Sequence, residues 1–292
     1  MGDKDNDYLY RFVFQDLGVR GEFVRLAASW QAVREKHAYP AWVQAPLGEA
    51  LATVSLLSAT IKFKGSLVMQ LQGDGLIRSL VAQATDRGTL RGMASFSDAE
   101  APPPEGSDGL LGHARLVLTA ESPEGERYQG IVPLEGGNVA AAVEYYFRQS
   151  EQLPTRLWLA ADEQVATGLL LQRLPGASGD REDWTRVETL ADTTTRVELL
   201  SLDVEELLYR LFHEEEVRLY DPQPVSFRCG CSRERVGQAL VAIGEGEVAQ
   251  ILDEMGSIEV NCEFCNARYR FDAVDAAALF QATSGDAPDR VQ

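Results

Sequence analysis

The chain has 292 residues, 45% of them hydrophobic, which is enough to bury a core and to form two domains. Its formal charge is −18, from 27 Lys and Arg against 45 Asp and Glu. That charge repels phosphate backbones and anionic lipid, so we expect neither nucleic acid nor a membrane surface as a partner. The acidic, polar start of the chain and the lack of a long apolar run predict no secretory leader and no membrane span, and hence a cytoplasmic protein.

Strand and helix patterns alternate from the start of the chain. β-Forming residues predict strands between residues 8 and 27, with turns at Gly18 and Gly21, followed by a helix near Ser29–Lys36. The segment Pro46–Lys62 predicts a helix that is apolar on nearly every side, as is typical of a helix buried in a core.

Further strands are expected up to residue 175. Leu67, Met69 and Leu71 alternate before a Gly-Asp-Gly turn, which predicts a hairpin over Ser66–Ser79. A proline-rich loop is predicted at 101–109, and Asn138 is expected to cap a helix. Additional strands are predicted around residues 116–118, 129–134, 156–161 and 168–175. This mixture indicates an α+β domain.

The composition changes after residue 175. Residues 180–195 are polar and threonine-rich, and as a helix they would have a thin apolar stripe made by Trp184, Val187 and Leu190. Asp203 is expected to cap a more strongly amphipathic helix that ends near Phe212. We therefore predict a helical connector of marginal stability over residues 176–225.

The four cysteines of the chain form two close pairs, Cys229-Gly-Cys231 and Cys262-Glu-Phe-Cys265. Thiolates are soft ligands, and four of them around a tetrahedral centre suit Zn²⁺. Clustered cysteines in a reducing cytosol are more often metal ligands or redox groups than structural disulfides. The spacing therefore predicts that Cys229, Cys231, Cys262 and Cys265 bind one zinc ion.

Such a zinc site can have one of three roles: binding nucleic acid, stabilising the fold, or switching with redox state. A nucleic-acid module is disfavoured, because residues 226–292 contain 6 Arg and no Lys against 11 Asp and Glu, a net charge of −5. A static structural site would stabilise a segment too short to rely on its own core. A redox switch is the third possibility, and the spacing alone does not decide between it and the static site.

The redox alternative follows from the spacing of the cysteines. Zinc would join the two pairs across thirty intervening residues, whereas each sulfur has its own pair-mate as its nearest partner on oxidation. Disulfides within each pair would close very small loops, which restrain an unfolded chain little, and a Cys-x-Cys disulfide should be strained and easily reduced. Oxidation would then replace a strong long-range constraint by two weak local ones and release the metal.

No arrangement of residues typical of a catalytic site is evident. The chain lacks a Gly-x-Ser-x-Gly motif, and its three histidines, His37, His113 and His213, are scattered along the sequence. We therefore expect that the protein is not an enzyme.

Several segments of the chain resemble the heat shock protein 33 family of redox-regulated holdase chaperones, also called 33 kDa chaperonins. The segments that carry this resemblance are Tyr128–Val132, Tyr146–Thr155, Gly168–Pro175, Leu211–Glu215, Cys229–Arg235 and Cys262–Asn266 with Tyr269 and Phe271. All four cysteine positions match the Cys-x-Cys and Cys-x-x-Cys pattern of that family.

The resemblance implies a cytoplasmic chaperone that works without ATP. In the reduced state it would hold one Zn²⁺ on the four cysteines and be inactive. Oxidation would form the Cys229–Cys231 and Cys262–Cys265 disulfides, release zinc and unfold the linker. The activated protein, usually a homodimer, would bind unfolding client proteins. The alternative is a protein of another class with a purely structural zinc site.

The expected fold is α+β, with an N-terminal mixed sheet-and-helix domain, a helical linker and a small C-terminal Cys₄ zinc-binding domain. The predicted boundaries are 1–175 for the core domain, which would bind clients and dimerise, 176–225 for the linker, 226–283 for the zinc domain and 284–292 for a disordered tail.

Overall fold

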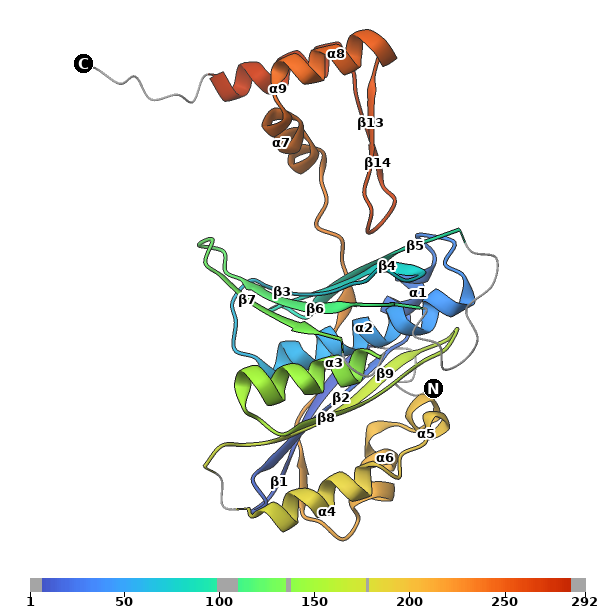
Figure 1. Ribbon diagram of the computed structural model, residues 1–292, viewed down its shortest axis with the longest axis vertical. Coiled ribbons are helices and arrows are strands. Elements are labelled where there is room, and N and C mark those ends of the chain that lie inside the picture. Colours follow the sequence, from blue (N-terminus) through green and yellow to red (C-terminus); the bar gives the residue numbers. More distant parts are fainter. Residues whose placement is uncertain (1–6, 99–109, 135–137, 177–178, 285–292) are drawn as a thin grey trace, which may run out of the picture. The chain divides into compact units, whose positions relative to one another are not determined.

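The computed structural model describes residues 7–98, 110–134, 138–176 and 179–284 (Figure 1). The chain forms two compact units, residues 1–228 and 229–292, and each is described by itself. The loop predicted at 101–109 and the tail predicted after residue 284 lie outside the described residues.

The first sheet of residues 1–228 has the strand order β10-β1-β2-β9-β8, with β11 also paired to β1. Every pair in it is antiparallel. Its strands are β1 (Tyr8–Phe14), β2 (Val19–Leu26), β8 (Thr155–Ala161), β9 (Ala166–Arg173), β10 (Val217–Leu219) and β11 (Gln223–Pro224). The strands predicted at 8–27, 156–161 and 168–175 are confirmed.

The second sheet has the order β12-β5-β4-β3-β6-β7. Its strands are β3 (Ser66–Gln72), β4 (Ile77–Thr85), β5 (Thr89–Phe96), β6 (Arg115–Glu121), β7 (Arg127–Pro133) and β12 (Ser226–Phe227). The predicted hairpin is formed by β3 and β4. Leu67, Met69 and Leu71 are the buried side chains of β3, and they alternate with partly exposed ones. The sequence patterns did not predict β5, nor the short β12 that pairs with it in parallel.

Helix α2 (Ala41–Thr60) lies between the two sheets (Figure 1) and contacts strands of both. It begins five residues before the predicted start, directly after Pro40, and it contains Pro46 in its second turn. The prediction that this helix is buried nearly all round is confirmed. Its buried hydroxyls are satisfied within the helix, since Thr53 Oγ1 donates to the Glu49 carbonyl and Ser55 Oγ to that of Leu51.

Two other helices complete this layer. Helix α1 (Ala28–Arg34) receives its N-terminal cap from Asp7, whose carboxylate accepts hydrogen bonds from the backbone N–H groups of residues 27–29. Helix α3 (Val139–Tyr146) begins at Asn138, whose side chain accepts from the N–H of Ala141 as predicted. It continues into a short π-helix, η2 (Phe147–Glu151).

The two glycines predicted to make turns near the start of the chain differ in role. Gly18 has a φ of 63° and lies in the turn between β1 and β2. Gly21 lies inside β2, so its prediction as a turn residue is wrong. A Cβ on Gly21 would stand 2.1 Å from the ring of Phe12, and glycine is therefore required there by close packing.

Helices α4 (Arg181–Ala191), α5 (Arg196–Ser201) and α6 (Val204–Phe212) cover the face of the first sheet opposite α2. Each begins with a capping box, at Asp180, Thr195 and Asp203 respectively. Their apolar residues form one cluster with side chains of β1, β2, β8 and β9, including Phe12, Phe14, Phe23, Leu169 and Leu171. The sequence patterns predicted α4 and α6 but not α5. They also predicted fewer buried apolar side chains in this segment than the cluster contains.

Residues 229–292 form a smaller unit with helices α7 (Arg233–Ile243), α8 (Glu245–Met255) and α9 (Ala273–Ser284) and the antiparallel strands β13 (Ile258–Asn261) and β14 (Arg268–Phe271). Among its described residues, the buried hydrophobic core is formed by Leu240, Val248, Ile258, Phe271 and Ala276. Helix α7 ends at Gly244 and helix α8 at Gly256, and both glycines have a positive φ. The strand β14 was not predicted.

Candidate metal centre

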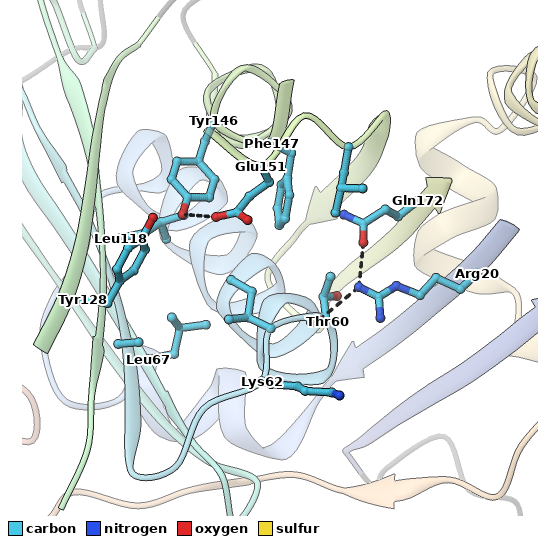
Figure 2. Close-up of a pocket in the computed structure, with 13 residues that line it drawn as sticks. Arg20, Thr60, Lys62, Leu67, Leu118, Tyr128, Tyr146, Phe147, Glu151 and Gln172 are labelled. Carbon is cyan, nitrogen blue, oxygen red and sulfur yellow. Dashed lines mark hydrogen bonds between the residues drawn. The ribbon is translucent and has the colours of Figure 1, made fainter. Parts of the chain in front are cut away.

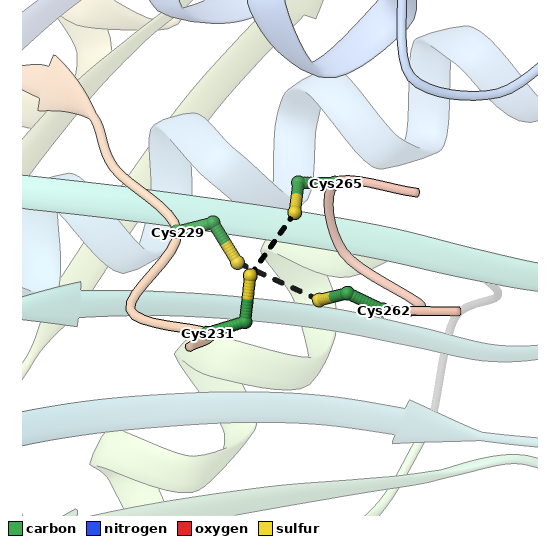
Figure 3. A group of neighbouring side chains, drawn as sticks. All are labelled: Cys229, Cys231, Cys262 and Cys265. Carbon is green, nitrogen blue, oxygen red and sulfur yellow. Dashed lines mark hydrogen bonds between the residues drawn. The ribbon is translucent and has the colours of Figure 1, made fainter. Parts of the chain in front are cut away.

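The four cysteine sulfurs meet at one point of the unit formed by residues 229–292 (Figure 3). All four Sγ atoms lie within 4.8 Å of one another. The Cys229 and Cys262 sulfurs are 3.6 Å apart, and those of Cys231 and Cys265 are 3.3 Å apart. Four thiolates around a tetrahedral zinc ion, each about 2.3 Å from it, would be separated by ~3.8 Å. The sulfur arrangement therefore fits a tetrahedral metal ion.

The first pair of sulfurs is placed by the start of α7. Ser232 caps this helix by accepting a hydrogen bond from the N–H of Arg235. The side chain of Arg235 in turn donates to the carbonyl of Gly230, between the two cysteines, at 2.9 Å. The helix end therefore fixes the short loop that presents Cys229 and Cys231.

The second pair of sulfurs lies in the turn between β13 and β14. The N–H of Cys262 donates to the carbonyl of Ala267 at 2.9 Å, and the N–H of Asn266 donates to that of Cys262 at 2.7 Å. Asn266 has a φ of 57°, a left-handed conformation that asparagine tolerates better than most residues. This closed turn directs Cys262 and Cys265 to the same side.

Tyr269 is a residue of this centre that sequence reasoning did not single out as functional. Its hydroxyl donates to the sulfur of Cys231 at 3.1 Å, and this hydrogen bond raises the pKa of Tyr269 to about 12. A hydrogen bond to a ligand sulfur is the kind of contact that orients a metal ligand. Its sequence signals were an aromatic side chain four residues after the second cysteine pair and its place in the family resemblance.

The electrostatics of the four thiols depend on a cation. Burial, followed by hydrogen bonds with the other three cysteines, raises the pKa of Cys265 to about 12. The raised pKa favours the protonated form of the Cys265 thiol at neutral pH when no cation is bound. A bound divalent ion reverses that balance and holds coordinated thiols as thiolates. The donor set and its spacing therefore suit a metal that prefers sulfur.

All four cysteines singled out in the sequence are brought together, and the histidines are not part of the group. Within the part of the chain that the structure describes, this is the one cluster of at least three His, Cys, Asp or Glu side chains with metal-binding spacing. His113 lies 3.4 Å from Asp74, and His213 lies against the ring of Tyr209, both in residues 1–228. None of the helices described here has the length and apolar character needed to cross a membrane.

Known proteins resemble the chain over almost its whole length. Residues 7–272 match the family model described as Hsp33 protein. A 33 kDa chaperonin of Nitrosococcus oceani is 55% identical over 280 residues, which cover 96% of each chain. A 33 kDa chaperonin of Shewanella frigidimarina is 46% identical and covers 96% of this chain and 97% of its own.

The fold agrees with these sequence matches. The crystal structure of a 33 kDa chaperonin, the Hsp33 homologue of Thermotoga maritima, superposes with a TM-score of 0.82 at 25% sequence identity. The match covers 96% of this chain and 99% of the other. Family model, sequence relatives and fold therefore agree, and the chain belongs to the Hsp33 family of chaperones.

Proposed function

We propose that this chain is a redox-regulated holdase chaperone that works without ATP and is switched by its four cysteines. The observation that supports this most directly is the cluster of four sulfurs from two segments thirty residues apart. The cluster joins the start of this unit to the turn between β13 and β14, and five hydrophobic side chains are buried in the core of its described residues. A unit this small depends on whatever links its two cysteine segments.

In the proposed reduced state, Cys229, Cys231, Cys262 and Cys265 hold one Zn²⁺, and the protein does not bind clients. The ion supplies a structural link and keeps the four sulfurs as thiolates. Structural zinc contributes on the order of 10–16 kcal/mol to folding in small domains. The hydrogen bond from Tyr269 to Cys231 keeps one ligand in place.

In the proposed oxidised state, two disulfides replace the metal. The two thiolates of each pair give up two electrons to one molecule of hydrogen peroxide, which takes up two protons from the solvent and is reduced to two molecules of water; a sulfur–sulfur bond forms, the two zinc–sulfur bonds break, and the zinc ion leaves. We propose Cys229–Cys231 and Cys262–Cys265 as the pairs. A loop of about four residues is worth about 2 kcal/mol as a constraint on the unfolded chain. Two such loops cannot replace the link that zinc makes between the segments.

Unfolding of the linker would connect the loss of zinc with the binding of clients. Helices α4, α5 and α6 cover an apolar sheet face that includes Phe12, Phe14 and Phe23. Polar contacts also hold these helices in place, since Arg156 lies 2.9 Å from both Glu188 and Asp192. We propose that residues 176–225 unfold after zinc release and that the exposed sheet face and linker then bind unfolding proteins.

The division into a core domain (1–175), a linker (176–225), a zinc domain (226–283) and a tail (284–292) is part of this proposal. So are a cytoplasmic location, a homodimer in the activated state, and the absence of enzymatic activity. The net charge of −18 argues against nucleic acid and membrane surfaces as partners. The competing proposal is that the metal has only a structural role.

The test compares reduced and peroxide-treated protein in three measurements: bound zinc, disulfide pairing by peptide mass spectrometry, and suppression of aggregation of a heat-unfolded enzyme. We expect loss of one zinc ion per chain, the two within-pair disulfides, and suppression only after oxidation. The variant Met255→Ser is the control for oxidation of a sulfur outside the cluster, because the Met255 side chain is exposed and belongs to the same unit. Protein that loses its zinc and never suppresses aggregation would support the purely structural role instead.

The pairing measurement is informative in its own right. Two short sulfur–sulfur contacts in the structure join different pairs, Cys229 with Cys262 at 3.6 Å and Cys231 with Cys265 at 3.3 Å. Disulfides between those residues would preserve the long-range link and would leave the unit folded. Detection of such cross-pair disulfides in active protein would contradict the proposed switch.

A further inference from the structure

A second candidate site lies within residues 1–228, the unit that contains no cysteine. A cavity of about 210 Å³ is lined by side chains from both sheets, from the end of α2 and from α3 and η2 (Figure 2). Tyr128, Tyr146 and Gln172, which belong to three separate segments of the family resemblance, form part of its wall. The proposed zinc switch uses none of these residues.

One part of the cavity is apolar. Leu67, Leu118 and Phe147 contribute buried side chains to its wall. An engineered apolar cavity of about 150 Å³ is large enough to hold benzene. This cavity therefore has room for one ring-sized apolar group together with a short polar end.

A second part of the wall is cationic. The guanidinium of Arg20 is held by two uncharged acceptors, the carbonyl of Thr60 at 3.0 Å and the side-chain oxygen of Gln172 at 2.6 Å (Figure 2). Its Nε lies 3.8 Å from the Glu22 carboxylate, which is too far for a hydrogen bond. Burial raises the pKa of Glu22 to about 7, so this carboxyl group neutralises Arg20 only in part near neutral pH.

Lys62 adds a second positive charge at the rim. Its side chain is exposed, and it forms no ion pair with any residue that the structure describes. Neither Arg20 nor Lys62 donates a hydrogen bond to a carboxylate among the described residues. They favour an anionic group on a ligand.

The remaining polar wall fixes the direction of such a ligand. The carboxylate of Glu151 accepts a hydrogen bond from the Tyr146 hydroxyl at 3.0 Å, beside Tyr128 (Figure 2). Glu151 repels an anion, whereas Arg20 and Lys62 attract one. An anionic ligand would therefore place its charge toward the two cations and its apolar body against Leu118 and Phe147.

We propose that this cavity binds an apolar carboxylate, a compound with a ring-sized apolar group one or two carbons from a carboxylate. A free small acid and the C-terminal residue of a polypeptide both have this chemistry. The carboxylate would bind between Arg20 and Lys62, and the apolar group would fill the cavity.

The binding test uses the full chain in its zinc-bound form with ¹³C-labelled Ile and Leu methyl groups. The probe is 3-phenylpropionate, and the matched probes are 3-phenylpropanol, without charge, and 3-phenylpropylamine, with the opposite charge. We expect saturable shifts of the methyl groups of Ile61, Leu67 and Leu118 with the acid. The alcohol should bind about tenfold more weakly because it cannot form charge-assisted hydrogen bonds. N-Acetyl-phenylalanine in place of the free acid tests whether the end of a chain is accepted.

Two variants test the role of charge with little effect on folding. Lys62→Gln should weaken binding of the acid about fivefold, as for loss of an exposed charge pair. Lys64→Gln is the matched control, because Lys64 is also exposed and only two residues away but does not line the cavity. Ala120→Leu should abolish binding by filling the cavity, and the fold of that variant is checked by its remaining methyl spectrum.

Three results would overturn the proposal. The first is the absence of saturable shifts at the cavity methyl groups. The second is equal binding of the acid and the alcohol, or preferred binding of the amine. The third is an equal loss of affinity in Lys62→Gln and Lys64→Gln. None of these results bears on zinc release, so this site and the proposed switch are tested separately.

Discussion

The two units of this chain are stabilised in different ways. Residues 1–228 contain two large apolar clusters, one around α2 and one beneath α4–α6. The described part of residues 229–292 contains five buried hydrophobic residues and a cluster of four sulfurs. Burial of apolar surface does not respond to oxidants, whereas thiolates bound to a metal do. The same oxidant should therefore act directly on residues 229–292, and the proposed unfolding of residues 176–225 in the first unit would follow from that event.

The largest expected effect is the loss of one metal ligand. Cys262→Ser replaces a thiolate by a hydroxyl, which is a poor ligand for zinc, and should remove the greater part of about 10 kcal/mol of folding energy from residues 229–292. Hydrogen exchange should show unprotected amides over 229–284, with the amides of α2 and of strands β2 to β9 unchanged. The exposed Met255→Ser is the control and should keep its zinc. Protected amides over α7–α9 in the Cys262 variant would contradict this difference between the units.

A substitution in the apolar core should destabilise the first unit and leave zinc binding by the second unit unchanged. Leu51 is fully buried in α2, and Leu51→Ala should destabilise residues 1–228 by about 4 kcal/mol through lost burial and the cavity that it leaves. Denaturant unfolding measures this change, and bound zinc should stay at the wild-type level. Val197→Ala, at a side chain that is 72% exposed, should change stability by less than about 0.5 kcal/mol. If the Leu51 variant also lost its zinc, the two units would not be independent.

A buried carboxyl group should make the first unit sensitive to pH. Burial raises the pKa of Glu22 to about 7, above its value in an unfolded chain, so the folded state binds this proton more tightly. The stabilisation is complete below the unfolded pKa and is lost as the pH rises through about 7. Glu22→Gln should therefore be more stable than wild type above pH 7, by on the order of 3 kcal/mol, and should differ little at pH 4.

Urea unfolding at pH 4, 6 and 8 measures this dependence. The variant Glu124→Gln, in an exposed turn, serves as the control and should show no such trend. A gain for Glu22→Gln that is the same at all three pH values would show that ionisation of Glu22 is not the cause.

The smallest expected effect concerns the linker helices. The hydroxyl of Thr194 is buried and has no hydrogen-bond partner among the described residues. Thr194→Val removes this hydroxyl with little change of shape and should stabilise α4–α6 by about 1 kcal/mol. Exchange of their amides should slow, and under the proposed function activation by peroxide should be delayed about fivefold.

Thr185→Val is the matched control for that change, because its exposed hydroxyl already donates to the carbonyl of Arg181. It should give no stabilisation. If Thr194→Val slowed amide exchange in the linker and left the activation time unchanged, unfolding of these helices would not be the step that controls activation.

Local sequence was sufficient to predict the candidate metal centre and much of the secondary structure. Ligand chemistry is a property of the cysteine side chain, and the spacing within each pair is set by one short turn, so Cys229, Cys231, Cys262 and Cys265 could be identified directly. The alternation in β3 and the cap at Asn138 involve residues two or three positions apart, and these predictions are confirmed for the same reason.

Other features depend on partners far away in the chain, and only the tertiary structure decided them. Leu9 and Phe12 of one strand face different clusters because each side of the first sheet is covered by different helices. Gly21 is required by the ring of Phe12 on the neighbouring strand, although its sequence context suggested a turn. Tyr269 is directed at Cys231 by the β13–β14 turn, and the cavity at Arg20 joins segments more than a hundred residues apart. The physical reason is that long-range packing selects among arrangements that local propensity leaves open.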